Sequence, residues 1–88
     1  MWFRSMTFTG TENFSISVEE GQKIYLYAYT TNIRMANFEQ DLDINYLKIP
    51  CDTANKGQSP LVFTCDNTQM LYFTPDTNNA AELHIMVI

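Results

Sequence analysis

The chain has 88 residues, of which 45% are hydrophobic and 14% aromatic, and its formal net charge is −5. This length fits one domain, residues 1–88, with a small core, and the composition excludes an intrinsically disordered chain. The 5 cationic side chains are scattered, which excludes the basic patch that nucleic-acid binding through phosphates requires. No apolar run is long enough to span a membrane and no secretion leader is recognisable, so we expect an intracellular or virion protein, unless a leader has been removed.

The first predicted strand runs over residues 2–9. Trp2, Met6 and Phe8 share one face of it, and Arg4 interrupts that face. Because successive side chains of a strand point to opposite sides, this face is expected to turn toward the core. A cluster of turn-forming residues follows at 10–13 and ends the strand.

Residues 14–30 carry the clearest strand signal. Apolar and polar side chains alternate with a period of two on both sides of the segment Glu19-Glu20-Gly21. Such a segment closes a three-residue hairpin loop when its glycine adopts a positive φ. We therefore predict a β-hairpin in which residues 14–18 pair with residues 22–26.

The second half of this segment presents a row of tyrosines. Tyr25, Tyr27 and Tyr29 share one strand face, at spacings of roughly 6.6–6.8 Å. Tyrosine combines a large apolar ring with a polar tip, which suits protein interfaces and sugar-stacking platforms. A second core layer or a solvated ladder of rings is the alternative role.

The rest of the chain predicts short elements. A helical turn is expected near residues 32–38, with Met35 and Phe38 packing inward. Further strands are expected at 44–49, 61–65, 69–74 and 82–88, separated by turn signals. About seven short strands favour an all-β fold, a small single-domain antiparallel β-sandwich.

The predicted last strand is apolar on both faces. His84, Met86 and Ile88 share the face opposite to Leu83 and Ile85. Such a strand is usually covered on both sides. Either it is central in the sandwich and covered by loops, or its second face or its edge packs against another subunit.

Two cysteines, Cys51 and Cys65, flank a predicted hairpin loop. A symmetric hairpin would set them opposite each other and permit a disulfide that closes the loop. Two reduced cysteines in adjacent strands are the alternative. Two cysteines without a paired histidine do not make a zinc site.

Residues 41–45 resemble the start of a calcium loop, because Asp41, Asp43 and Asn45 supply alternate oxygen ligands. Tyr46 stands where that loop needs glycine, so a polar strand face is the preferred interpretation and calcium binding the alternative. For catalysis, His84 with a cysteine is the only conceivable pair, and nothing places them together. We therefore expect no enzyme and no cofactor.

The sequence thus predicts a non-catalytic interaction module, namely a small oligomeric accessory or structural protein of a virus- or phage-like particle. The chain holds ten threonines and eight asparagines against three lysines, which is typical of turn-rich β proteins. We expect a protein partner, with homo-oligomers formed through the tyrosine row or the His84–Ile88 edge. The alternatives are a carbohydrate-binding module with a tyrosine platform and a small acidic inhibitor of a host or rival protein.

Overall fold

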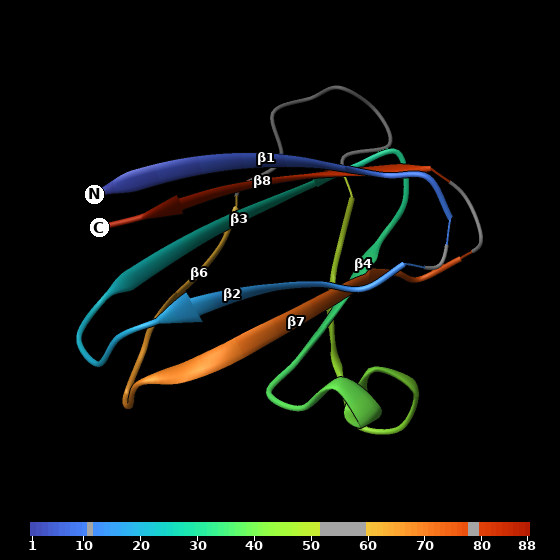
Figure 1. Cartoon of the computed structure of the whole chain (residues 1–88). Coiled ribbons are helices and arrows are strands. Elements are labelled where there is room, and N and C mark those ends of the chain that lie inside the picture. Colours follow the sequence, from blue (N-terminus) through green and yellow to red (C-terminus); the bar gives the residue numbers. More distant parts are fainter. Residues whose placement is uncertain (11, 52–59, 78–79) are drawn as a thin grey trace.

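The computed structural model describes residues 1–10, 12–51, 60–77 and 80–88. Within these ranges lie eight strands and one short 3₁₀-helix, η1 (Glu39–Asp43), as Figure 1 shows. The strands are β1 (Trp2–Phe8), β2 (Phe14–Val18), β3 (Lys23–Tyr29), β4 (Ile33–Ala36), β5 (Leu47–Ile49), β6 (Leu61–Thr64), β7 (Gln69–Pro75) and β8 (Ala81–Val87). The predicted all-β class is confirmed, with eight strands rather than seven.

The strands form two antiparallel sheets of four strands each. The first sheet has the order β1-β8-β3-β6 and the second sheet the order β2-β7-β4-β5. This is the arrangement of a jelly roll, in which the chain crosses repeatedly between two facing sheets. Because β1 pairs with β8, the two chain ends lie side by side (Figure 1).

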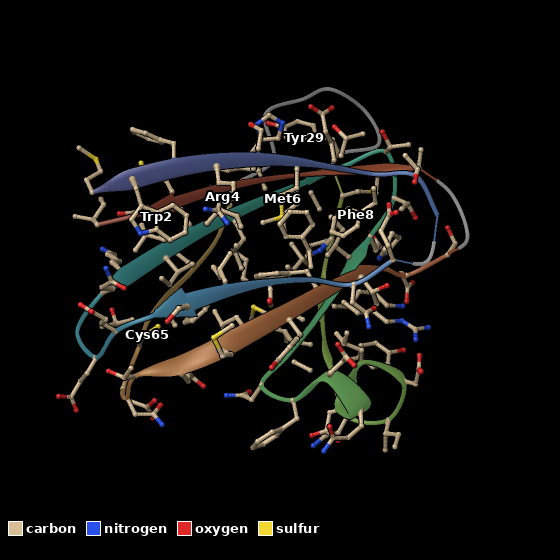
Figure 2. The ribbon with its side chains drawn as sticks, in the orientation of Figure 1. Trp2, Arg4, Met6, Phe8, Tyr29 and Cys65 are labelled. Atoms are coloured by element: carbon tan, nitrogen blue, oxygen red, sulfur yellow. The ribbon has the colours of Figure 1, made fainter. Side chains whose placement is uncertain are left out.

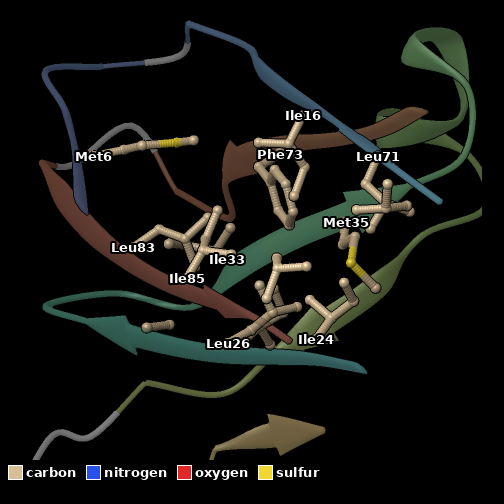
Figure 3. Close-up of a cluster of buried hydrophobic side chains, with 14 of the residues drawn as sticks. Met6, Ile16, Ile24, Leu26, Ile33, Met35, Leu71, Phe73, Leu83 and Ile85 are labelled. Atoms are coloured by element: carbon tan, nitrogen blue, oxygen red, sulfur yellow. The ribbon is translucent and has the colours of Figure 1, made fainter. Parts of the chain in front are cut away.

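The hydrophobic core lies between the two sheets. In β3 and β8 a buried side chain alternates with a half-buried or exposed one over the whole strand, as the period-two pattern requires. Figure 3 shows side chains of both sheets meeting there, among them Leu26 and Leu83 from the first sheet and Ile16, Met35 and Phe73 from the second. The inward face predicted for β1 is confirmed, since Met6 and Phe8 are buried.

The predicted hairpin of β2 with β3 is wrong. β2 pairs with β7, setting Ile16 opposite Leu71, whereas β3 pairs with β8 and β6. Alternation shows which face of a strand is buried, but it does not show which strand lies beside it. Two strands in facing sheets of a sandwich carry the same alternation as two strands of one hairpin. The segment after Glu19 therefore carries the chain from one sheet to the other.

The positive φ predicted for Gly21 is confirmed, at 89°. The N–H of Gln22 donates to the carbonyl of Glu19 (3.1 Å), and the N–H of Gly21 donates to the carbonyl of Cys65 (2.8 Å). The crossing turn is thus tied to the end of β6 as well as closed on itself. Apart from Gly21 itself and its two chain neighbours, no described residue has a heavy atom within 4 Å of where a Cβ would stand on Gly21.

Gly21→Val is expected to lower the free energy of unfolding by about 2 kcal/mol, measured from the urea midpoint at unchanged m-value. The cost is one of backbone conformation, because the space for the side chain is open. Thr30, at the end of β3, has a φ of 80°, so Thr30→Gly supplies the control with the opposite sign and should raise the midpoint. Equal midpoints for wild type and Gly21→Val would contradict the turn geometry.

The helical turn expected near residues 32–38 is also misplaced. Residues 33–36 form β4, and η1 begins only at Glu39. Met35 is buried as expected, but Phe38 is 60% exposed. A four-residue strand is too short for its period to be told from one turn of helix. The strand expected at 44–49 is correspondingly short, because η1 and its closing turn occupy the chain through Asn45.

The two sheets differ in what covers their outer faces. η1 packs on β4 and β7 of the second sheet, where Leu42 and Ala36 are buried apart from the main core. No helix in the described ranges packs on the first sheet. None of the described helices is long and apolar enough to cross a membrane.

Candidate functional site

The first sheet joins two surfaces that the sequence predicted separately. β3 lies beside β8, so Tyr25 pairs with Met86, Tyr27 with His84 and Tyr29 with Glu82. All of these side chains alternate with buried ones and therefore point away from the core. Figure 2 shows Tyr29 on the outer side of this sheet, with Met6 and Phe8 on the inner side. The outer face of the first sheet is the candidate site.

One end of this face is apolar. Phe3 pairs with Met86, Met86 with Tyr25, and Tyr25 with Val62, so a single row crosses all four strands. Ile88 follows in the next row, opposite Lys23. Phe3 is 70% exposed and Ile88 53%. We call Phe3, Tyr25, Val62, Met86 and Ile88 the apolar patch.

The middle of the face is polar and centres on His84. Ser5 Oγ lies 3.0 Å from His84 Nδ1, and His84 Nε2 lies 3.1 Å from Glu82 Oε1. The ring of Tyr29 meets the imidazole edge-on, with centroids 4.9 Å apart. These contacts fix the orientation of the imidazole.

A hydroxyl, an imidazole and a carboxylate in hydrogen-bond contact resemble the groups of a hydrolytic triad. Here they lie on an open sheet face, and the side chains of His84 and Glu82 are 40% and 47% exposed. These contacts order the side chains of this face. The cluster differs from the cysteine–His84 pair, which was the only conceivable catalytic pair in the sequence.

A shallow hollow of about 360 Å³ opens on this face over β8. Phe3 and Met86 line its apolar side, and Ser5, Tyr27 and His84 line its polar side. The sequence did not identify Phe3 and Ser5 as site residues. They reach this face only because β1 pairs with β8, and Ser5 and His84 are 79 positions apart in the chain.

A second polar cluster lies on the outer face of the second sheet. Arg34 Nε donates to Asp76 Oδ1 (2.7 Å), and Lys48 Nζ lies 3.2 Å from Asp76 Oδ2. The guanidinium also stacks on the ring of Tyr46 at 4.3 Å and donates to the carbonyl of Leu42 (3.2 Å). The hydrogen bond from Arg34 holds the pKa of Asp76 below its ordinary value. This cluster anchors η1 to the sheet.

Comparison with known proteins informs the fold alone. No family model matches the chain, and no curated protein matches it. Among solved structures, the chain is similar to the solution NMR structure of a de novo designed double-stranded β-helix, with a TM-score of 0.66 over 100% of both chains. The two sequences are 9% identical. The likeness thus supports a double-stranded β-helix fold, the same arrangement as the jelly roll, and no activity.

The last strand of this double-stranded β-helix is central. β8 lies between β1 and β3, and the backbone of Ile88 exchanges two hydrogen bonds with Lys23 (2.9 and 3.0 Å). An interface through the edge of residues 84–88 is therefore wrong, since both edges of β8 are occupied. An interface through the outer side chains of His84 and Met86 stays a prediction.

The two cysteines do not face each other, and both are free. Cys65 pairs by its backbone with Gln22, whereas Cys51 forms a bridge with Ala28. The two partners, Gln22 and Ala28, are six residues apart along one extended segment, a distance of about 20 Å. The two cysteines are therefore beyond the reach of a disulfide. Burial raises the pKa of the Cys65 thiol, which disfavours its thiolate. The loop of residues 52–59 lies outside the described residues.

The three candidate calcium ligands do not converge either. Asp41 and Asn45 line a hollow on one side of η1, and Asp43 lines a hollow on the other side. Asp43 Oδ1 instead lies 3.4 Å from Arg34 Nη1. In the described part of the chain no cluster of three or more His, Cys, Asp or Glu side chains is placed to hold a metal. The polar strand predicted here is η1 and its closing turn.

Proposed function

We propose that this protein is a non-catalytic interaction module that associates with copies of itself through the outer face of the first sheet. The observation that carries the proposal is the row in which Phe3, Met86, Tyr25 and Val62 cross the four strands. Phe3 and Val62 at the two ends of this row are exposed, and Tyr25 and Met86 between them are half-buried. An apolar row that spans a whole sheet in this way is typical of a protein–protein contact. Full burial of one such side chain stabilises by roughly 1.5–3 kcal/mol.

The apolar patch is self-complementary, which favours a second copy as its partner. A two-fold axis parallel to the strands and between β8 and β3 would set Met86 of one copy over Tyr25 of the other. The same axis would set Phe3, on the outer strand β1, over Val62, on the outer strand β6. Sulfur–aromatic contact and a large ring over a smaller aliphatic side chain are both favourable packings. Two-fold contacts of this kind are the commonest in oligomers.

The further proposal, a structural or accessory role in a virus- or phage-like particle, rests on fold-level analogy. Double-sheet jelly rolls occur in viral capsid domains, but also in lectins and cupins. A fold therefore supports this role without specifying it. The oligomer through the apolar patch is the part that the side chains of this chain support.

Phe3→Asp is expected to reduce the native mass to that of one chain, 10.2 kDa, in sedimentation velocity. A carboxylate buried without a partner in the contact between Phe3 and Val62 opposes association. Ile88→Asp is expected to act in the same direction at the rim of the patch.

Ile44→Asp is the matched control. Ile44 is 77% exposed and lies next to η1, on the opposite outer face, so its substitution adds the same charge away from the patch. An unchanged mass for Phe3→Asp and Ile88→Asp, or an equal loss for Ile44→Asp, would contradict the proposed interface.

A further inference from the structure

We propose that a cleft beside η1, on the outer face of the second sheet, binds a neutral carbohydrate. This site is distinct from the tyrosine face, which lies on the other sheet. The cleft is open to solvent and has a volume of about 610 Å³, within the range of roughly 300–1,000 Å³ that small-ligand sites occupy. Its lining comes from two segments, residues 37–45 with η1 and residues 67–72 with the start of β7.

Side-chain amides dominate the polar lining. They are Asn37, Asn45, Asn67 and Gln69, and Asp41 is the only charged group that the described part of the chain adds to the lining. Each amide offers both donors and an acceptor, which matches a sugar hydroxyl that both donates and accepts. Asn37 Nδ2 donates to Gln69 Oε1, so two amides are held side by side with further donors and acceptors to offer.

Two aromatic rings and the side chain of Met70 form the apolar part of the lining. Phe38 is 60% exposed, a high value for phenylalanine, and Tyr72 projects from β7 into the same cleft. Phe38 is held at the start of η1, because its carbonyl accepts the N–H of Asp41 (3.0 Å). The flat apolar face of a pyranose ring packs on such rings while its hydroxyls reach the amides. An exposed aromatic ring beside four amides is therefore explained by a sugar ligand.

The charge of the lining selects among ligand classes. Among the described residues no cationic side chain lines the cleft, so a phosphate or carboxylate ligand would find no counter-charge there and would be repelled by Asp41. A single carboxylate is too few for a calcium ion. An uncharged nucleoside shares the need for amides and a stacking ring, but it offers fewer hydroxyls to a lining of four amides, so a sugar is favoured.

The test is a titration of the labelled full chain followed by backbone amide NMR shifts. The probes are glucose, galactose, mannose, N-acetylglucosamine, maltose, cellobiose and lactose, with adenosine as the nucleoside probe. We expect at least one sugar to shift amides of residues 37–45 and 67–72 with a millimolar Kd. Phe38→Ala should raise the Kd for that sugar about tenfold, since a stacking contact contributes roughly 1.4 kcal/mol to the binding free energy.

Ile44→Ala is the control, because Ile44 is an exposed apolar residue of the same segment that does not line the cleft. It should leave the Kd unchanged, and the undisturbed amide spectrum of Phe38→Ala outside the cleft would show that the variant is folded. The proposal is overturned if no sugar shifts the cleft amides, or if Phe38→Ala binds as tightly as wild type. Shifts with adenosine alone, or shifts confined to the tyrosine face, overturn it as well.

Discussion

Phe73→Ala is expected to remove about 4 kcal/mol from the free energy of unfolding, the largest effect of any single substitution discussed here. Phe73 lies in β7, a central strand of the second sheet, and is fully buried. It pairs with Phe14 on one side and Met35 on the other, and Figure 3 shows its ring at the centre of the core. Truncation therefore leaves a cavity that neighbours on both sheets cannot fill.

The measurement is a urea unfolding curve at neutral pH. A domain of 88 residues has a stability of roughly 4–13 kcal/mol, so the variant should be largely unfolded or have a midpoint strongly shifted to low urea. Phe38→Ala is the matched control, because it truncates an exposed phenylalanine and should change the free energy by less than about 0.5 kcal/mol. Equal effects for the two variants would contradict the placement of the core.

Arg34→Met is expected to lower the free energy of unfolding by about 3 kcal/mol at pH 7. The side chain of Asp76 is only 13% exposed, and without Arg34 its carboxylate keeps Lys48 as an ion-pair partner but loses its shortest hydrogen bond. The substitution also removes the donor to the carbonyl of Leu42 and the stacking on Tyr46. We therefore expect η1 to loosen first, with faster amide exchange over residues 39–43.

The pH dependence separates this ion pair from simple packing. Arg34 holds the pKa of Asp76 below its unfolded value, so the stabilisation is present above that unfolded value, near pH 4, and is lost as pH falls through the folded value. The difference between wild type and Arg34→Met should thus be largest at neutral pH and shrink below about pH 4. Lys48→Met, which removes the more exposed partner, should cost under about 1 kcal/mol. A difference that stays constant with pH would contradict the electrostatic origin.

The side-chain pattern predicted most of the strands, but not β4, which was expected as a helical turn, and not the partners of the strands. β3 and β8 alternate so regularly that the side chains sharing each face could be predicted from the sequence. Pairing depends on which sheet each strand enters, and the two sheets of a sandwich bury the same kind of face. For this reason the turn at Gly21 was predicted with the correct φ and the wrong neighbours.

The candidate site shows the same division. The shared face of Tyr25 and Tyr27 and the shared face of His84 and Met86 were predicted on two separate strands, and their union into one surface required the contact of β3 with β8. Phe3 joins that surface only through the pairing of the two chain ends. The amide-lined cleft was not predictable, because it is built around η1, where a polar strand was expected.

If the chain associates through the apolar patch, as we propose, the wild-type protein has a native mass above that of one chain. Light scattering should be recorded at several protein concentrations, from about 10 µM to about 1 mM, so that mass action is visible. We expect a defined multimer of at least twice the 10.2 kDa of one chain. A mass of 10.2 kDa at every concentration would contradict it.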